Sequence, residues 1–411
     1  MAGRKRTREK RQSIMRAGGR GVPAFLAKTD WITLLLCFAA SVFGLLLVHS
    51  ATLRTAQAAE MPVSRDVIVM AAATVLGAAI AIAASFLDYE LILRFWYVFA
   101  GVCLLMMMLL FTPLRAAPAG RADSAVWIKL PVAGGIFFQP SELLKVGFII
   151  SFTWHLHLVR NNINKLKAMV MLAVHAGLPF ALVVRTGDLG SALVFLCITA
   201  GMLFLAGLRL RWFAAMLALA AAAMPAVWIY FINSFQKQRI YAVYAPQMLT
   251  EEQLKAVLYQ QRQARYAMGS GQLLGEGLFK GSYIQSGSVP ESQNDMIFSV
   301  AGEELGFVGA LGVLLLLAVI VIRLVRVSGR TRNTRARLLC SGVALMIGAQ
   351  VVINIGMCIQ LLPVIGITLP FFSAGGSSNL CVYIGIGLVL TAYRHQNEHE
   401  DTESYFDYLY T

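Results

Sequence analysis

The stretch QSGSVPESQNDMIFSVAGEELGFVG, Gln285 to Gly309, changes character at its middle. The residues up to Asp295 are polar and rich in turn formers, and Met296 opens a long apolar run. An apolar run of about 20 residues predicts a membrane-spanning helix, so Asp295 is expected where an aqueous loop meets that helix. The stretch therefore predicts an integral membrane protein with a carboxylate at its water–lipid boundary.

The composition of the whole chain leads to the same class. Of 411 residues, 58% are hydrophobic and 14% are charged, and the mean hydropathy is +0.68. Repeated apolar runs of about 20 residues are typical of membrane helices, and a soluble protein could not bury this much apolar surface. We predict an all-α polytopic membrane protein with about ten transmembrane helices and a large extracellular loop, residues 235–294, between the seventh and eighth helices. The predicted helices cover residues 31–50, 66–87, 92–112, 138–158, 167–185, 189–207, 212–233, 296–322, 338–361 and 375–393.

The formal net charge of +14 lies mostly in the N-terminal tail and in the connections between apolar runs. This distribution follows the positive-inside rule, so we expect contact with anionic membrane lipids and no binding of nucleic acid. The arginine-rich connection 323–337 is then cytoplasmic, as are both termini. The expected organisation is a basic cytoplasmic tail (1–30), a membrane domain (31–393) and a cytoplasmic C-terminal tail (394–411).

The cysteine and histidine residues are the candidates for disulfide bonds and metal ligands. The six cysteines lie in or at the edges of apolar runs and have no paired spacing. His155 and His157 are two positions apart and would point to different faces of a helix. We expect neither a disulfide framework nor a metal site from these residues.

Several charged residues fall within or between the predicted spans, and three of them are candidates for a site. Glu142 and Lys145 are three positions apart, so they share a helix face and can form an ion pair. The pair is either the wall of a cavity that binds an anionic headgroup, with Lys145 facing phosphate, or an internal ion pair that gives the fold specificity. Asp188 either caps the sixth span or belongs to a site.

Asp295 has two interpretations from its position alone. It can cap the free backbone N–H groups of the following helix, or it can act as a catalytic base at the membrane boundary. Gly302 and Gly306 would share its helix face and predict close contact with a neighbouring helix. The glycine-rich segment Leu369–Ser378 joins spans nine and ten, and at membrane depth it must line a cavity or be buried in protein.

The large loop contains an amphipathic segment. Residues Thr250–Met268 combine apolar side chains with Arg262 and Arg265, which predicts a helix at the level of the lipid headgroups. The loop is either a structural cover over the bundle or a functional surface, since loops often carry function.

Five segments occur in one order between the predicted spans. They are Trp127 followed by GGIFFQPSELLK, then DLGSAL, YQQRQARYAMGSGQLLGEGL, VPESQNDMIFSVAGEELGFVGA and NIGMCIQLLPVIGITLPFFSAGGSS. Together they resemble the SEDS family of bacterial cell-wall proteins, the group that contains RodA, FtsW and SpoVE, and the last segment is most similar to the RodA members. The resemblance covers most of the chain, from the first predicted span to the tenth.

The resemblance implies a peptidoglycan glycosyltransferase. Such enzymes polymerise lipid II at the outer face of the bacterial cytoplasmic membrane, for cell elongation, shape or division. A class B penicillin-binding protein, which cross-links the product, is the implied partner. The family's catalytic aspartate maps onto Asp295, its loop tryptophan onto Trp127, and its membrane glutamate and lysine onto Glu142 and Lys145.

The chemistry of such a transfer suggests roles for further residues. A sugar hydroxyl attacks the anomeric carbon of the donor, and a carboxylate within hydrogen-bond reach of that hydroxyl can act as general base. Cationic groups, or a divalent cation such as Mg²⁺ or Mn²⁺, can stabilise the departing lipid pyrophosphate. The candidates for phosphate contact are Lys145, Arg239, Arg262 and Arg265, and Glu291 can assist or hold a cation. The other candidate substrate contacts are Trp127, Glu142, Asp188, Ser377 and Ser378.

The chain also departs from the usual family motifs. The family reads His-Thr-Asp-Phe where this chain has Gln293-Asn294-Asp295-Met296, and Ala374 stands where the family has tyrosine. These departures support an alternative function, a non-catalytic scaffold that recruits a class B penicillin-binding protein. A transporter that flips the lipid-linked precursor would use the same paired membrane charges and broken helices. The chain shows no convincing internal repeat, which disfavours the transporter.

Overall fold

The computed structural model describes residues 29–116, 126–129, 137–230 and 232–395. The predicted tails lie outside the described residues except at positions 29–30 and 394–395. The described chain is almost entirely helical, as the sequence predicted. The helices of the bundle are α3 (Trp31–Ala51), α5 (Arg65–Ala84), α6 (Tyr89–Arg94), α7 (Trp96–Leu109), α8 (Pro140–Leu158), α9 (Leu166–Arg185), α10 (Leu189–Leu205), α11 (Leu210–Tyr230), α16 (Gly306–Arg330), α17 (Thr334–Cys358) and α18 (Gly376–Arg394).

Each predicted span contains at least one helix of the structure. Seven helices of the described chain are long and apolar enough to cross a membrane: α3, α5, α9, α11, α16, α17 and α18. The apolar helices α7 and α10 are shorter, and α8 carries the charges of Glu142 and Lys145. The chain is therefore a multi-pass membrane protein, while the number of crossings stays a prediction.

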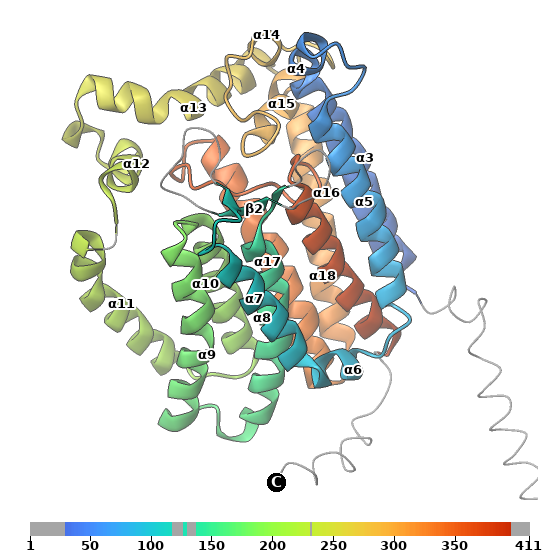
Figure 1. The fold of residues 1–411 in the computed structure, drawn as a ribbon, viewed down its shortest axis with the longest axis vertical. Coiled ribbons are helices and arrows are strands. Elements are labelled where there is room, and N and C mark those ends of the chain that lie inside the picture. The colour runs from blue at the N-terminus through green and yellow to red at the C-terminus, as the bar shows by residue number, and fades with distance from the viewer. Residues whose placement is uncertain (1–28, 117–125, 130–136, 231, 396–411) are drawn as a thin grey trace, which may run out of the picture.

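A second group of short elements covers one end of the bundle. It comprises α4 (Leu53–Ala58), α12 (Ser234–Tyr244), η3 (Pro246–Met248), α13 (Glu251–Ser270), α14 (Ser282–Gln285) and α15 (Ile297–Glu304). We call this group the cover layer, and Figure 1 shows it above the bundle, with α13 running across the top. The amphipathic helix predicted at Thr250–Met268 is α13, and Thr250 and Gln253 form a capping box at its start.

A small antiparallel sheet also lies near the cover layer. Its strands are β1 (Arg115–Ala116), β2 (Trp127–Lys129) and β3 (Phe137–Phe138), in the order β1-β2-β3. Strand β3 ends directly before α8. A 3-10 turn, η2 (Arg160–Asn162), follows α8 at the opposite end of the bundle.

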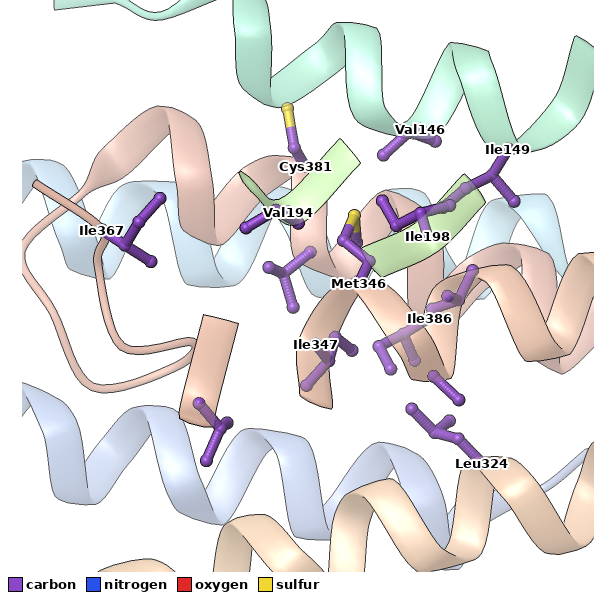
Figure 2. Packing of buried hydrophobic residues seen from close by; sticks show 14 of the residues in the cluster. Val146, Ile149, Val194, Ile198, Leu324, Met346, Ile347, Ile367, Cys381 and Ile386 are labelled. Atoms are coloured by element: carbon purple, nitrogen blue, oxygen red, sulfur yellow. The ribbon is translucent and has the colours of Figure 1, made fainter. Parts of the chain in front are cut away.

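Helices α17 and α18 form the centre of the bundle. In Figure 2 buried side chains of α8, α10, α16, α17 and α18 meet there, including Ile149, Ile198, Met346 and Ile386. Small residues permit the close approach of α5 and α18, since a Cβ atom on Gly77 would lie 2.7 Å from the Cβ of Tyr383. In a bilayer this packing, rather than hydrophobic exclusion from water, holds the helices together.

Helix α11 is packed quite differently. None of its residues, all of which the structure describes, is buried. Figure 1 shows α11 at the edge of the bundle, where Trp212, Phe213 and Met216 near its start pack against the core and most of the later residues are exposed. The rest of the bundle therefore does not depend on α11 for its core.

The eighth predicted span is not one helix, and this corrects the sequence prediction. The chain turns between α15 and α16 at Leu305 and Gly306, and Gly306 has a φ of 68°. Glycine adopts this left-handed conformation without the steric cost of a side chain. The backbone of Gly275 and Leu273 approaches so closely that a Cβ on Gly306 would lie 2.4 Å from the Gly275 nitrogen.

Candidate functional site

Asp295 lies in a turn immediately before α15 and is half-buried. Helix α15 begins at Ile297 with Met296 as its N-cap residue, so Asp295 does not occupy the cap position, which was one of its two interpretations. The prediction that Gly306 shares a helix face with Asp295 is wrong, because the chain turns at Leu305. Asp295 is thus held by a turn rather than by a regular helix.

The turn that carries Asp295 is fixed through its main-chain oxygens. The carbonyl oxygen of Gln293 accepts a hydrogen bond from the Ala374 N–H at 2.9 Å. The carbonyl of Asn294 accepts from Ser373 Oγ at 2.7 Å, and the carbonyl of Asp295 accepts from Asn354 Nδ2 at 2.8 Å. Three consecutive carbonyl groups are therefore bound to α17 and to the glycine-rich segment after it.

Glu291 begins the same turn and is exposed. Its carbonyl oxygen accepts from the N–H groups of Asn294 and Met296, at 3.0 Å and 3.2 Å. Its carboxylate accepts from Asn294 Nδ2 at 2.8 Å. Glu291 has a φ of 53°, a left-handed conformation that is uncommon outside glycine and asparagine. The turn is therefore held by hydrogen bonds within itself as well as by those to neighbouring segments.

The beginnings of α8, α10 and α18 meet close to this segment. The Gln139 N–H donates to Ser377 Oγ at 3.1 Å, which connects α8 with α18. Gln139 Nε2 and Ser141 Oγ each donate to Asp188 Oδ2 at 2.8 Å, which connects α8 with α10. Asp188 Oδ1 accepts from the Ser191 N–H at 2.9 Å, so Asp188 is the cap that was one of its two interpretations.

Ser378 faces the segment that precedes α18, and Ser377 faces the segment that precedes α8. Ser377 Oγ donates to the carbonyl of Phe137, and Thr368 Oγ1 donates to Ser378 Oγ at 2.8 Å. Both serines are buried. The glycine-rich segment is therefore buried in protein, which is one of the two outcomes predicted for irregular backbone at membrane depth.

Glu142 and Lys145 form a buried ion pair. Lys145 Nζ lies 2.7 Å from Glu142 Oε1, and the side chains are 0% and 5% exposed. Of the two interpretations, the contacts match the internal ion pair rather than a cavity wall. A direct contact between this pair and a substrate would need the surrounding helices to move.

Trp127 is half-buried in β2, where it pairs with Ala116 of β1. The strand register places Trp127 beside the sheet strand that leads into α8.

The three arginines of the cover layer that are candidates for phosphate contact have different surroundings. Arg239 Nη1 donates to the Val364 carbonyl at 2.8 Å, and its guanidinium lies 4.6 Å from the Phe235 ring centroid. Arg265 is exposed and donates to Gln360 Oε1 at 2.7 Å. Arg262, half-buried on α13, makes no hydrogen bond or ion pair with the described part of the chain. Arg262 is thus the most available of these cations for a ligand.

A divalent cation has limited support from the donor set. No group of three His, Cys, Asp or Glu side chains gathers as a ligand set within the described residues. Mg²⁺ is commonly held by one or two carboxylates together with substrate phosphates, and Asp295 and Glu291 lie at the two ends of one turn. These residues fit a cation that arrives with a pyrophosphate better than one held by the protein alone.

Two residues at the turn between α15 and α16 were not predicted as part of this site. The carboxylate of Glu303 accepts from the N–H groups of Tyr283 and Ile284, at 2.6 Å and 3.1 Å. The carboxyl group of Glu304 accepts from Ser50 Oγ of α3 and from Gln285 Nε2. Both glutamates are buried, and their hydrogen bonds hold residues 283–285, which precede the Asp295 turn in the chain.

The main chain of the same two glutamates binds the loop before α14. The Glu276 N–H donates to the Glu303 carbonyl and the Gly277 N–H to the Glu304 carbonyl, each at 2.9 Å. Hydrogen bonds from Ser282 lower the pKa of the Glu276 carboxyl. The available sequence signal was a pair of adjacent glutamates flanked by glycines in an apolar run.

The structure thus brings together one part of the predicted site. Asp295, Glu291 and the Ser377–Ser378 segment lie around the contact between the Asp295 turn and residues 367–378. Asp188 joins them through α8 and α18. The Glu142–Lys145 pair lies inside the bundle, and Arg265 and Arg239 bind the segment that follows α17.

Comparisons with known proteins agree with this arrangement. The family model for FtsW, RodA and SpoVE, described as cell cycle protein, matches residues 30–398. The chain is 31% identical to the probable peptidoglycan glycosyltransferase FtsW of Trichlorobacter lovleyi, over 90% of this chain and 94% of that protein. It is 32% identical to the peptidoglycan glycosyltransferase MrdB of Escherichia coli, over 66% of this chain and 71% of that protein.

Solved structures show the same likeness. A chain of the structure described as "Structural coordination of polymerization and crosslinking by a peptidoglycan synthase complex" matches with a TM-score of 0.72 and 28% identity, over 90% of this chain and 99% of that chain. The rod shape determining protein RodA of Thermus thermophilus matches with a TM-score of 0.64 and 27% identity, over 90% of this chain and 98% of that chain.

Proposed function

The chain belongs to the FtsW, RodA and SpoVE family, and from that premise we propose that it polymerises lipid II into glycan strands with Asp295 as the general base. Its relatives are named peptidoglycan glycosyltransferases, and the chain is an enzyme of that class. The observation that carries the assignment to Asp295 is its half-buried position in a turn whose three main-chain carbonyls are bound. The family resemblance predicted from the sequence motifs is confirmed.

The reaction needs a base and a means of stabilising the leaving group. Asp295 accepts the proton of the acceptor hydroxyl while that oxygen bonds to the anomeric carbon of the donor, and the bond from that carbon to the lipid pyrophosphate breaks. Because the turn is held at both sides, little reorganisation is needed to place the carboxylate beside the hydroxyl.

The pyrophosphate of the donor is anionic and gains a further negative charge as its bond to the anomeric carbon breaks, so it needs positive charge nearby. The beginnings of α8 and α18 meet at the cover end of the bundle, and helix N-termini carry partial positive charge, whereas the beginning of α10 is already capped by the Asp188 carboxylate. Arg262 adds a full charge on α13. When a divalent cation is bound, it would supply further stabilisation of that charge, with Asp295 and Glu291 as its protein ligands.

The departures from the family motifs support catalysis more than they oppose it. At Gln293 and Ala374 the contact between the two segments is main chain to main chain, which any residue except proline can supply at the donor. The side chain of Asn294 closes the turn on Glu291. None of these contacts requires the usual histidine, threonine or tyrosine.

The setting of the enzyme follows from the same proposal. We place the cover layer at the outer face of the bacterial cytoplasmic membrane, with both termini in the cytoplasm, because the arginine-rich connection 323–337 lies at the opposite end of α16 and α17. A class B penicillin-binding protein is the proposed partner. A protein of the same fold has been solved in a peptidoglycan synthase complex.

The replacement Asp295→Asn tests the proposal. It keeps the size of the side chain and removes its basicity, so the protein should fold normally while polymerisation falls by about 100-fold or more. The assay is glycan strand formation from lipid II by purified protein, with the partner supplied. Long strands made at the wild-type rate by Asp295→Asn would show that Asp295 is not the base.

Asp88→Asn is the matched control. Asp88 caps α6 by accepting the Glu90 N–H at 2.9 Å, at the opposite end of the bundle, and asparagine caps helices about as well as aspartate. The control should retain wild-type activity. The same pair of variants also addresses a precursor transporter, because flipping of the lipid requires no base and would survive Asp295→Asn.

A further inference from the structure

Asn354 lies near the end of α17 and is completely buried, with 0% of its surface exposed. Its Nδ2 group donates two hydrogen bonds, one to the Asp295 carbonyl at 2.8 Å and one to the Ile367 carbonyl at 2.7 Å. One amide therefore joins the Asp295 turn to the segment after α17. Both of its N–H bonds are used for this purpose.

Ser373 makes a second connection of the same kind. Its hydroxyl donates to the Asn294 carbonyl at 2.7 Å and accepts from the Leu369 N–H at 2.7 Å. The residue is 3% exposed. The hydroxyl therefore fixes the fold of residues 369–373 and the Asp295 turn in one position relative to each other.

We propose that Asn354 and Ser373 are positioning residues for the general base, which rests on the proposed function of Asp295. Ser373 binds the carbonyl of Asn294, and Asn354 binds the carbonyl of Asp295. The two hydrogen bonds therefore lie on either side of the Asp295 Cα atom. Together they restrict rotation about the backbone of Asp295 and so the direction of its carboxylate. Neither residue needs to touch the substrate.

The expected size of this effect follows from the geometry of base catalysis. A general base must lie within about 2.6–3.2 Å of the atom whose proton it takes. A displacement of about 1 Å of a catalytic group can lower the rate roughly 100-fold. Without the Asn354 bond, the Asp295 carbonyl loses a donor at 2.8 Å and keeps the longer contact with Cys358 Sγ at 3.6 Å.

The first test is Asn354→Leu, which keeps the branched shape and the number of heavy atoms of the side chain and removes both donors. We expect kcat to fall about 10–100-fold while KM for lipid II changes by less than about twofold, because the variant affects the base and not the binding of substrate. The matched control is Gln350→Met, one turn earlier on α17. Gln350 is also 0% exposed, and neither of its polar atoms has a partner in the described chain, so kcat should be unchanged.

The second test uses Ser373, and it remains informative if Asn354→Leu fails to fold. Ser373→Ala should lower kcat in the same way, and Ser373→Thr, which keeps the hydroxyl, should restore it. The matched control is Ser341→Ala at the far end of α17, where a buried serine hydroxyl donates to the Arg337 carbonyl. A serine with a purely structural role would lower the yield of folded protein without this recovery of kcat by threonine.

The double variant Asp295→Asn with Ser373→Ala decides whether the residue acts through the base. If Ser373 only positions Asp295, its removal should lower the residual rate of Asp295→Asn by less than about threefold. If Ser373→Ala lowers kcat by the same factor in the wild-type protein and in Asp295→Asn, the positioning assignment is wrong and Asp295 remains the base. The same conclusion follows if Ser373→Ala and Asn354→Leu both keep the wild-type kcat. Wild-type kcat in Asp295→Asn overturns both assignments.

Discussion

Helices α17 and α11 have similar hydropathy but opposite surroundings. Both are long and apolar enough to cross a membrane, with 25 and 21 residues. Most of α17 is buried at the centre of the bundle, whereas no residue of α11 is buried. Hydropathy therefore predicts that a helix enters the membrane and leaves open whether it packs against others.

The difference between the two helices lies in their polar residues and glycines, because α11 is as rich in alanine as a helix interface usually is. Helix α17 contains Ser341, Gly342, Gln350 and Asn354, all buried. From Trp212 to Tyr230, α11 contains neither a charged nor an amide side chain nor glycine. Since lipid is as apolar as leucine, helices associate in a bilayer through close contact and polar contacts rather than through hydrophobicity. Three replacements test this comparison.

The largest effect is expected at the buried ion pair of α8, which packs against α17. Lys145→Met leaves Glu142 buried without its partner and should cost about 3–5 kcal/mol of stability. The double variant with Glu142→Gln should be closer to wild type than either single variant, because no buried charge remains. Thermal unfolding in detergent measures all three.

The matched change on α11 is Arg211→Met, which removes an exposed cation that lies 5.8 Å from the Trp212 ring centroid. It should change stability by less than about 0.5 kcal/mol. Equal losses for Lys145→Met and Arg211→Met would show that the pair is solvated and that the comparison between buried and lipid-exposed charge does not hold.

An intermediate effect is expected from Gly342→Leu on α17. A Cβ atom there would lie 2.6 Å from Ile149 Cγ2 and 3.0 Å from Met202 Sδ, so the added side chain must displace α8 or α10. Overpacking of this kind costs about 1–3 kcal/mol. Ala222→Leu on exposed α11 is the control and should leave the midpoint of thermal unfolding unchanged. A large loss from Ala222→Leu would mean that α11 packs against the bundle.

The smallest effect is expected from Gln350→Met, and its sign is informative. Replacing a buried amide that lacks partners by an apolar side chain of similar size should be neutral or stabilise the protein by about 1 kcal/mol. A clear loss of stability would show that Gln350 is hydrogen-bonded, through water or through residues outside the described part of the chain. The midpoint of thermal unfolding is again the measurement.

The positions of the helices could be predicted from the sequence because apolar runs are long and bounded by caps. The first predicted span, 31–50, corresponds to α3, Trp31–Ala51, and the span 189–207 begins at the same residue as α10. The break at Leu305 could not be predicted from hydropathy, because apolar residues continue on both sides of it. The break is accompanied by close contact between Gly306 and the loop at Gly275, and a contact between such separate parts of the sequence leaves no local pattern.

The candidate site was predictable only in part for a related reason. Asp295 was found because a carboxylate at the start of an apolar run is unusual and because the motifs around it resemble a family. Asn354 was noted as a polar residue of the ninth span, but its partners are main-chain atoms of two other segments. Contacts to backbone leave no complementary residue type in the sequence, so spacing and composition cannot reveal them.

The turn between α15 and α16 has a mechanical consequence. As one straight helix, residues 297–330 would extend about 50 Å at 1.5 Å per residue, well beyond a hydrocarbon core of about 30 Å. Helix α16 by itself, with 25 residues, is about 37 Å long and can tilt to match the bilayer. Helix α15 is meanwhile anchored to α3 and to the loop before α14 by Glu303 and Glu304. A change in membrane thickness would thus be absorbed as rotation at Gly306, and Asp295 would keep its height above the lipid.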